Sequence, residues 1–233
     1  MKITIQRETP TEFEVKGIED ITLLALLNTI KTTQDSSLTF ASGCRSSVCG
    51  SCSMRVNGKE VLACSYKVQE GDFIEPLKNM PIIRDLVVNM DSAYEKNKKA
   101  KAWLSSITQT IPLTQENEKI NELQSDCILC GSCYSACPVF SVNEDFLGPF
   151  SLTRIWKYVS DKRETDEKRM IDTIQTDGVW SCTLCNECTL ICPQNISSKA
   201  DIEKLRAKSS MAGYSDPNFN SFSGFGFDGS PVF

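Results

Sequence analysis

Short segments that alternate between apolar and polar residues begin the chain and predict a small α+β unit. Positions 2–7 and 12–16 alternate with the period of a half-buried strand. Four apolar residues then recur at helical spacing, at Leu23, Leu24, Leu27 and Ile30. We therefore expect a strand pair followed by an amphipathic helix at the amino-terminal end.

A hairpin and a last short strand are expected to complete this unit. Asn57 and Gly58 separate apolar segments at 53–56 and 59–62, and this dipeptide favours a two-residue type I′ turn between antiparallel strands. Positions 73–77 predict the last strand, which Pro76 interrupts at its edge. The first domain is expected at residues 1–90, with a connector that begins near residue 78.

The pattern becomes helical after residue 90, and a second domain is expected at residues 91–213. The predicted helices cover 91–104, 116–123, 149–158, 165–176 and 198–208. Pro149 suits the first turn of its helix, while Gly178 and Gly213 are placed to end two others.

The segment 214–233 shows neither a helical nor a strand period. It carries five phenylalanines among glycine, serine and asparagine, at Phe219, Phe222, Phe225, Phe227 and Phe233. This composition favours disorder, but five aromatic side chains are costly to leave in water. The alternative interpretation is an extended arm that becomes ordered on a partner.

Twelve cysteines carry the candidate chemistry, and two groups of them share the run Cys-x2-Cys-x2-Cys-x3-Cys-Pro. In two-cluster ferredoxins the first three thiolates of such a run hold one cluster, and the fourth ligates the other. The spacing therefore predicts one [4Fe–4S] cluster held by Cys127, Cys130, Cys133 and Cys192. It predicts a second [4Fe–4S] cluster, with [3Fe–4S] as the alternative, held by Cys137, Cys182, Cys185 and Cys188.

The third group has the spacing of plant-type [2Fe–2S] ligands and consists of Cys44, Cys49, Cys52 and Cys64. Gly43 and Gly50 are expected to permit positive φ and a close backbone approach, so that N–H groups point at cluster sulfurs. Every cysteine is thereby assigned to a cluster, which predicts an electron carrier. The order of the expected strands and helices predicts the α+β class. The protein's expected parts are a β-grasp domain of the plant-type ferredoxin kind and an all-α domain of the bacterial two-cluster kind.

Two other uses of the cysteines are considered. Disulfides would suit a small secreted protein, but the first residues lack the apolar segment of a signal peptide. Zinc held by four thiolates per site would make the chain an interaction module without redox chemistry. Three cysteines at x2 spacing followed by x3-Cys-Pro fit zinc sites poorly, so iron–sulfur ligation is the favoured interpretation.

Composition excludes several functions. A net charge of −5 without a basic run argues against a nucleic-acid partner. The chain contains no histidine, which excludes Rieske ligation and histidine-based acid–base catalysis by its own residues. Neither a glycine-rich nucleotide loop nor an apolar segment long enough to cross a bilayer occurs in the sequence. We expect no catalytic residue and no membrane span in this chain.

Together these motifs resemble the iron–sulfur subunit of the succinate dehydrogenase/fumarate reductase family. The resemblance extends over residues 1 to about 208. The segments that carry it are 38–40, 43–45, 49–52, 62–64, 81–87, 127–133, 146–149 and Arg154. It implies a flavoprotein partner that carries the FAD and interconverts succinate and fumarate, while this chain carries electrons and has no turnover alone. A relay for another flavoprotein, linked to 2-hydroxy acids or to thiols and disulfides, is the alternative.

Three departures from the family pattern change what the resemblance implies. Most members have a non-cysteine residue at the position of Cys185 and hold a [3Fe–4S] cluster there. The tryptophan and histidine that approach quinone in quinone-reducing members correspond to Val142 and Thr183. A lysine- or arginine-rich context after the last Cys-Pro is replaced by Gln194 and Asn195. We therefore expect a third subunit, either a redox protein such as a cysteine-rich one or a membrane anchor. The expected location is free in the cytoplasm or peripheral on the cytoplasmic side of a membrane.

Overall fold

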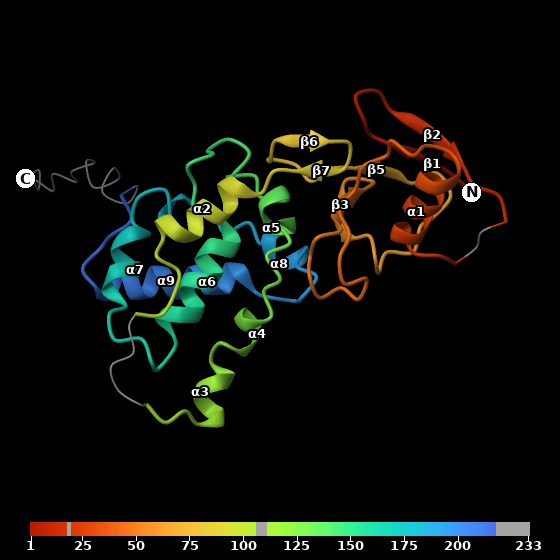
Figure 1. Ribbon diagram of the computed structural model, residues 1–233. Coiled ribbons are helices and arrows are strands. Elements are labelled where there is room, and N and C mark those ends of the chain that lie inside the picture. The colour runs from red at the N-terminus through yellow and green to blue at the C-terminus, as the bar shows by residue number, and fades with distance from the viewer. Residues whose placement is uncertain (18–19, 106–110, 218–233) are drawn as a thin grey trace, which may run out of the picture.

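The sheet of the amino-terminal domain and the helices of the following domain lie side by side along the molecule (Figure 1). The computed structural model describes residues 1–17, 20–105 and 111–217. In these ranges every strand lies before residue 89, and every helix except α1 lies after residue 90. This two-domain layout is the one predicted from the sequence.

Five strands form the sheet of the first domain in the order β2-β1-β5-β3-β4. Their bounds are Lys2–Ile5 (β1), Thr11–Glu14 (β2), Ser53–Val56 (β3), Lys59–Leu62 (β4) and Phe73–Glu75 (β5). Only the pairing of β1 with β5 is parallel; the other pairings described are antiparallel. The strand predicted to end at residue 77 ends before Pro76, because proline has no N–H to donate to the ladder.

Helix α1 (Leu23–Thr33) supplies the core that covers this sheet. The Thr22 hydroxyl accepts a hydrogen bond from the Ala25 N–H at 3.3 Å, which caps the first turn. The predicted stripe is fully confirmed, since Leu23, Leu24, Leu27 and Ile30 are all buried. Burial of each such side chain contributes about 2 kcal/mol relative to its exposure.

The hairpin turn is the predicted one. Val56 pairs with Lys59, and the two residues between them have positive φ, 50° at Asn57 and 84° at Gly58. The Asn57 amide also donates to the Asp72 carboxylate at 2.8 Å and accepts from the Phe73 N–H at 2.9 Å. The turn is therefore fixed to the neighbouring β5 as well as to its own strands.

The connector differs from the sequence expectation in two ways. It contains a small sheet of β6 (Ile82–Arg84) and β7 (Val87–Val88), which alternation over so few residues does not reveal. Helix α2 (Asp91–Lys99) ends earlier than predicted, because buried Ala100 and Ala102 follow it into the core. The Arg169 guanidinium donates to carbonyls of this non-helical segment and holds it in place.

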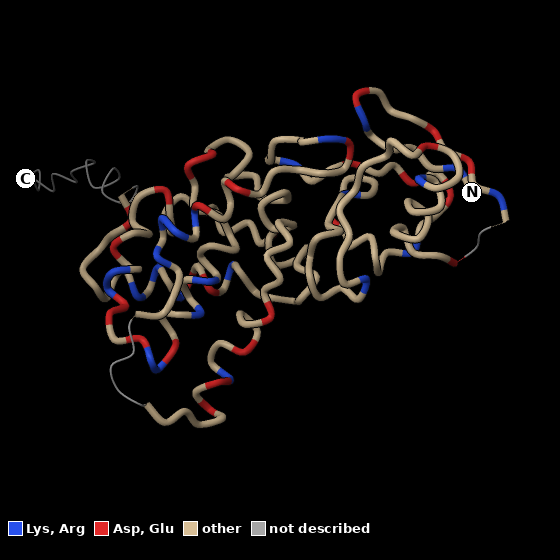
Figure 2. The backbone as a smooth tube through the Cα atoms, in the orientation of Figure 1, with Lys and Arg blue, Asp and Glu red and all other residues tan. Residues whose placement is uncertain are grey.

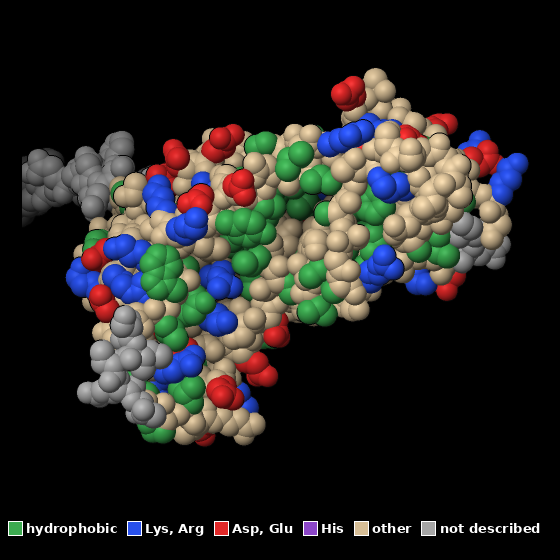
Figure 3. Space-filling model, viewed as in Figure 1, with side chains coloured by type: hydrophobic (Ala, Val, Ile, Leu, Met, Phe, Trp, Pro, Cys, Tyr) green, Lys and Arg blue, Asp and Glu red, His purple; other side chains and the backbone are tan. Residues whose placement is uncertain are grey.

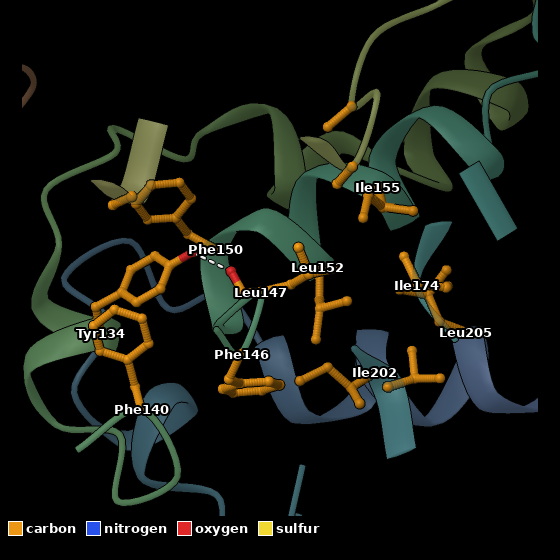
Figure 4. Packing of buried hydrophobic residues seen from close by; sticks show 14 of the residues in the cluster. Tyr134, Phe140, Phe146, Leu147, Phe150, Leu152, Ile155, Ile174, Ile202 and Leu205 are labelled. Carbon is orange, nitrogen blue, oxygen red and sulfur yellow. Dashed lines mark hydrogen bonds between the residues drawn. The ribbon is translucent and has the colours of Figure 1, made fainter. Parts of the chain in front are cut away.

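The second domain is built mainly from two packed helices, α6 (Pro149–Val159) and α9 (Ser198–Met211). The remaining helices are short: α3 Gln115–Lys119, α4 Glu122–Ser125, α5 Ser132–Ser135, α7 Lys168–Thr173, the 3₁₀ turn Val179–Ser181 and α8 Glu187–Leu190. Tyr134 lies at the centre of an aromatic group with Phe140 and Phe150 (Figure 4). Its hydroxyl donates to the Leu147 carbonyl, so the buried polar atom is satisfied.

Two predicted helices are shorter or divided. The segment 116–123 forms parts of α3 and α4, because Asn121 leaves the helical region between them. The helix predicted at 165–176 is reduced to α7, and a Cβ at Gly178 would lie 2.0 Å from the Ile174 carbonyl oxygen. The backbone folds back so tightly there that no side chain fits at position 178, which explains the glycine better than a simple helix stop.

The carboxyl-terminal segment is described only as far as residue 217. Gly213 has φ 88° and follows α9 as predicted, and the Tyr214 hydroxyl donates to Asp172 at 2.6 Å. The expectations for the five phenylalanines concern residues outside the described ranges. No helix in the described part of the chain is long and apolar enough to cross a membrane.

Candidate iron–sulfur centres

The loop 44–52 between α1 and β3 is curled by residues in the left-handed region. Arg45 has φ 61°, Ser47 has φ 60° and Gly50 has φ 72°. A non-glycine residue at positive φ costs free energy, so the arrangement has to be held by other contacts. The curl turns successive backbone N–H groups toward the inside of the loop.

Those N–H groups form a cradle around cysteine sulfurs. Three of them donate to Cys44 Sγ, each at 3.3 Å, from Ser46, Val48 and Cys49. The Ser47 N–H donates to Cys64 Sγ at 3.3 Å, and the Ser47 hydroxyl lies 3.5 Å from the same sulfur. Cradles of this kind stabilise thiolates and the negative charge of an iron–sulfur cluster.

Gly43 was expected to have positive φ, and this expectation is wrong. It is absent from the described residues with positive φ, where Arg45 and Ser47 occur instead. Its close approach is confirmed, because a Cβ at Gly43 would lie 2.8 Å from both Cys49 Sγ and Ser51 Oγ. The glycine makes room for these atoms.

Hydrogen bonds lower and burial raises the pKa values of the thiols in this group. The Ser51 hydroxyl, aided by backbone N–H groups, lowers the pKa of Cys49 to about 6. Burial raises the pKa of Cys52 to about 11. Burial also acts to raise the pKa of Cys64, but hydrogen bonds from Ser47 and Cys52 outweigh it and the net direction is downward. A positive metal centre would favour the thiolate at all these positions.

Four cysteines line one cavity in the second domain. They are Cys127, Cys130, Cys133 and Cys192, the set predicted for the first [4Fe–4S] cluster. Apolar side chains such as Leu129, Phe150 and Ile196 complete the lining. Burial, followed by the charges of neighbouring cysteines, raises the pKa of Cys133 well above its usual value. This repulsion is what the positive charge of iron would relieve, so the donor set suits a cluster.

A second cavity is lined by the other predicted set, Cys137, Cys182, Cys185 and Cys188. Burial raises the pKa of Cys188 to about 12, and the charges of the other three cysteines act in the same direction. Cys185 is the exposed member of the set. The fourth cysteine of each run therefore lies with the three cysteines of the other run, as the ferredoxin spacing predicted.

The two cysteine runs repeat one backbone conformation. Leu129 and Leu184 have φ 53° and 57°, and the residues two positions later, Gly131 and Asn186, have φ 82° and 77°. Each pair precedes a short helix, α5 or α8. The role of Asn186 was missed from the sequence, although the repeat places it opposite Gly131 and asparagine tolerates left-handed φ better than most residues.

The first cysteine loop contacts the second domain at one of the cysteines of that domain. A Cβ at Gly50 would lie 2.8 Å from Cys130 Cβ and 2.9 Å from the Ile128 carbonyl oxygen, so the first loop touches the second domain directly. On the far side, α5 packs against α8 between the two cavities. Few charged residues occur along these central loops (Figure 2), and hydrophobic side chains gather over the middle of the face shown in Figure 3.

The described cysteines are arranged for clusters and not for single metal ions. Among the described residues, no group of three or more cysteine and carboxylate side chains is arranged to hold one metal ion. Ligands of a cluster contact different irons and are therefore further apart than ligands of a single ion. The arrangement of cysteines around two cavities is consistent with that difference.

Comparisons with known proteins agree with this geometry. Residues 2–95 match the family model of the 2Fe-2S iron-sulfur cluster binding domain, and residues 123–196 match that of the 4Fe-4S dicluster domain. The chain is 38% identical over 213 residues to the iron–sulfur subunit of the 8-methylmenaquinol:fumarate reductase of Wolinella succinogenes, covering 85% of this chain and 67% of that protein. It is 35% identical over 208 residues to the fumarate reductase iron–sulfur subunit of Escherichia coli, covering 85% of each.

The chain belongs to the family of fumarate reductase and succinate dehydrogenase iron–sulfur subunits. The predicted family and its electron-transfer role are thereby confirmed, as are cofactors of the [2Fe–2S] and [4Fe–4S] types. The other-flavoprotein and zinc-module alternatives are not favoured.

Longer relatives and solved structures extend the comparison. An uncharacterized iron–sulfur protein of Methanocaldococcus jannaschii is 35% identical over 226 residues, and the chain spans 45% of its length. A chain in the structure titled Mycobacterium smegmatis Sdh1 complex in the apo form matches with a TM-score of 0.82. The match covers 93% of this chain and 98% of the other at 22% identity, which shows a shared fold.

Proposed function

We propose that this subunit holds three clusters in a row and that its polypeptide sets their order. The [2Fe–2S] ligands are Cys44, Cys49, Cys52 and Cys64. The first [4Fe–4S] ligands are Cys127, Cys130, Cys133 and Cys192, and the second are Cys137, Cys182, Cys185 and Cys188. The observation that carries this proposal is that two cavities are lined by the second and third of these sets.

The finer fold assignment rests on the same residues. The first domain is a β-grasp of the plant-type ferredoxin kind, since its five-stranded sheet is crossed by α1 and carries the curled loop 44–52. The second is an all-α domain of the bacterial two-cluster kind, since all its described regular elements are helical. Domain limits at residues 90 and 213 follow from this division.

A flavoprotein subunit that carries the FAD is the partner on one side of the relay. Relatives are named as subunits of fumarate reductases, so interconversion of fumarate and succinate is the reaction proposed for the assembled complex. The clusters accept and release single electrons. The chain holds the clusters, shields them with apolar side chains and orients N–H donors toward their sulfurs. No residue of this chain is proposed to contact the dicarboxylate.

A third subunit, either a membrane anchor or a redox protein, is proposed to dock near the second [4Fe–4S] site. Cys185 is exposed there, and Val142 and Leu190 expose 85% and 73% of their surface. Val142 offers no donor to a quinone carbonyl and Thr183 has only a short hydroxyl. Stabilising contacts to a reduced quinone would therefore be weak, and a partner that brings its own acceptor fits better. Any membrane association is proposed to come through partners.

The deciding experiment is anaerobic purification of the native complex, followed by iron analysis, EPR and a succinate–fumarate assay. Three clusters with four cysteines each predict about ten irons per chain, whereas a [3Fe–4S] centre in the third site predicts about nine. A complex with all three clusters that is inactive with both dicarboxylates would contradict the proposed reaction. A chain that contains zinc and no iron would contradict the relay itself.

A further inference from the structure

The side chain of Gln194 crosses the domain junction and reaches the first cysteine loop. Its Nε2 donates to the Ser47 carbonyl oxygen at 3.0 Å, between residues 147 positions apart in the sequence. Both side chains are half-buried, so the bond is partly shielded from competing water. No other described side-chain hydrogen bond joins the loop 44–52 to the second domain.

The peptide group between Ser47 and Val48 connects Gln194 to a cysteine sulfur. The carbonyl that accepts from Gln194 belongs to the same peptide group as the Val48 N–H, which donates to Cys44 Sγ at 3.3 Å. A hydrogen bond accepted at a peptide oxygen polarises the group and strengthens the bond that its N–H donates. The N–H of Ser47 itself donates to Cys64 Sγ at 3.3 Å. Fixing Ser47 therefore acts on two of the proposed [2Fe–2S] ligands.

The other end of Gln194 is attached to the first [4Fe–4S] site. Gln194 follows Cys192 by two positions and lines the same cavity. One residue thus lines the cavity of the first [4Fe–4S] site and places its side-chain amide on the peptide that serves the [2Fe–2S] site.

Ser47 also needs an external contact to keep its conformation. It has φ 60°, a left-handed conformation that is unfavourable for serine, and the bond that Gln194 donates to it opposes relaxation. Gly50 of the same loop lies against Cys130. Of these two contacts, the one from Gln194 is made to the peptide whose N–H donates to Cys44 Sγ.

We propose that Gln194 is a positioning residue for electron transfer between the [2Fe–2S] site and the first [4Fe–4S] site, acting through the Ser47 peptide. The inference rests on the ligand sets proposed above. It deepens them by assigning a role to a residue that is not a ligand. N–H donors stabilise the reduced cluster most, because reduction adds negative charge, so weaker donors should lower the [2Fe–2S] reduction potential.

The test compares Gln194→Ala, Gln194→Glu and Gln194→Lys in the full chain within its native complex. EPR-monitored redox titration gives the [2Fe–2S] midpoint potential, and the relaxation of its signal reports spin coupling to the first [4Fe–4S] centre. Gln194→Ala is expected to shift the potential to more negative values and to weaken the coupling. Gln194→Glu, which sets an acceptor against the Ser47 carbonyl, is expected to shift it further. Gln194→Lys keeps an N–H donor and is expected to recover part of the shift.

A matched control separates positioning from a mere link between domains. Ser135 donates to Glu60 across the same junction at 2.7 Å without touching the loop 44–52, so Ser135→Ala should leave the [2Fe–2S] potential at its wild-type value. Equal potentials in wild type and Gln194→Ala, with three clusters present, would overturn this inference alone. Equal shifts in Gln194→Ala and Ser135→Ala would also overturn it. A wild-type chain without a [2Fe–2S] signal would overturn the ligand proposal and this inference together.

Discussion

Gly50 and Cys130 are in contact across the domain junction. Gly50 has φ 72°, and a Cβ on it would lie 2.8 Å from the Cβ of Cys130, closer than real Cβ contacts permit. The loop that carries three of the proposed [2Fe–2S] cysteines therefore packs on a cysteine of the next proposed site without an intervening side chain. A short distance between two clusters favours electron transfer. The absence of a side chain at position 50 allows the loop to approach Cys130 this closely.

Gly50→Ala should consequently disturb the junction more than its backbone strain explains. The positive φ alone costs about 1–2 kcal/mol, and the clash with Cys130 adds to it. Gly71→Ala is the matched control, since Gly71 has φ 81° but a Cβ there would meet no described atom within 4 Å. Anaerobic thermal melts should show a larger loss for Gly50→Ala. Equal losses would mean that the contact with Cys130 is unimportant.

Cys185→Ser should remove one iron from the second [4Fe–4S] site. The remaining three cysteines still line the cavity, so a [3Fe–4S] centre is the expected product, and the iron content falls from about ten to about nine per chain. EPR of the oxidised protein should show the three-iron signal, with the other two clusters unchanged. Cys188→Ser, which removes a buried cysteine of the same set, should lose this cluster altogether. An unchanged iron content in Cys185→Ser would contradict its assignment as a ligand.

Arg206 should raise the reduction potential of the second [4Fe–4S] site. Its guanidinium donates to the Val179 carbonyl at 2.9 Å and to the Cys182 carbonyl at 2.5 Å, which places a positive charge beside a proposed ligand. Reduction adds negative charge to the site, so Arg206→Gln is expected to lower the potential measured by redox titration. Arg206→Lys keeps the positive charge, so its reduction potential should stay close to that of the wild type. A loss of the same size in both variants would assign the effect to the hydrogen bonds instead.

Asp201 should make stability depend on pH. It is 1% exposed, and burial raises its pKa to about 6, whereas an unfolded aspartate titrates near 3.9. Stability from this group is therefore present below about pH 4 and is lost as the pH rises through about 6. Asp201→Asn keeps an oxygen for the bond that Gln124 Nε2 donates at 2.8 Å. The free energy of unfolding of Asp201→Asn, relative to that of the wild type, should therefore rise by about 1 kcal/mol between pH 5 and pH 8.

Thermal melts across that pH range would measure this gain. Glu203→Gln lies on the same helix, and its carboxylate is 48% exposed and paired with Lys199, so it serves as the exposed control. A stability difference between Asp201→Asn and wild type that does not change with pH would contradict the prediction.

Removal of residues 218–233 should weaken association with a partner while leaving all three clusters intact. The reason is compositional, since five phenylalanines occur from Phe219 to Phe233 and their exposure to water is unfavourable. Co-purification and iron analysis measure the two effects separately. Replacing the five phenylalanines by serine in the full-length chain should reproduce the loss. Unchanged co-purification of the truncated chain would contradict a role for this segment in binding.

Several parts of the fold were predictable because their causes are local. Asn57 and Gly58 specify their turn by their own φ preferences, and the apolar stripe of α1 follows from helical spacing. The small sheet of β6 and β7 and the early end of α2 were not predictable. The turn between β6 and β7 is tied to Thr39, whose N–H donates to Asp85 at 2.7 Å, and the Arg169 guanidinium holds the segment after α2. Both contacts join residues that are far apart in the sequence.

The sequence by itself grouped the cysteines into the three proposed ligand sets. Ligand spacing is a property of the local chain, and the crossing of Cys137 and Cys192 between runs follows from the same spacing. Only the tertiary structure decided how the sets are joined: Gly50 against Cys130, Gln194 on Ser47, and left-handed φ at Arg45 and Ser47 rather than at Gly43. These contacts link residues up to 147 positions apart. Local preferences cannot specify them, because they form only when the packing of both domains brings the loops together.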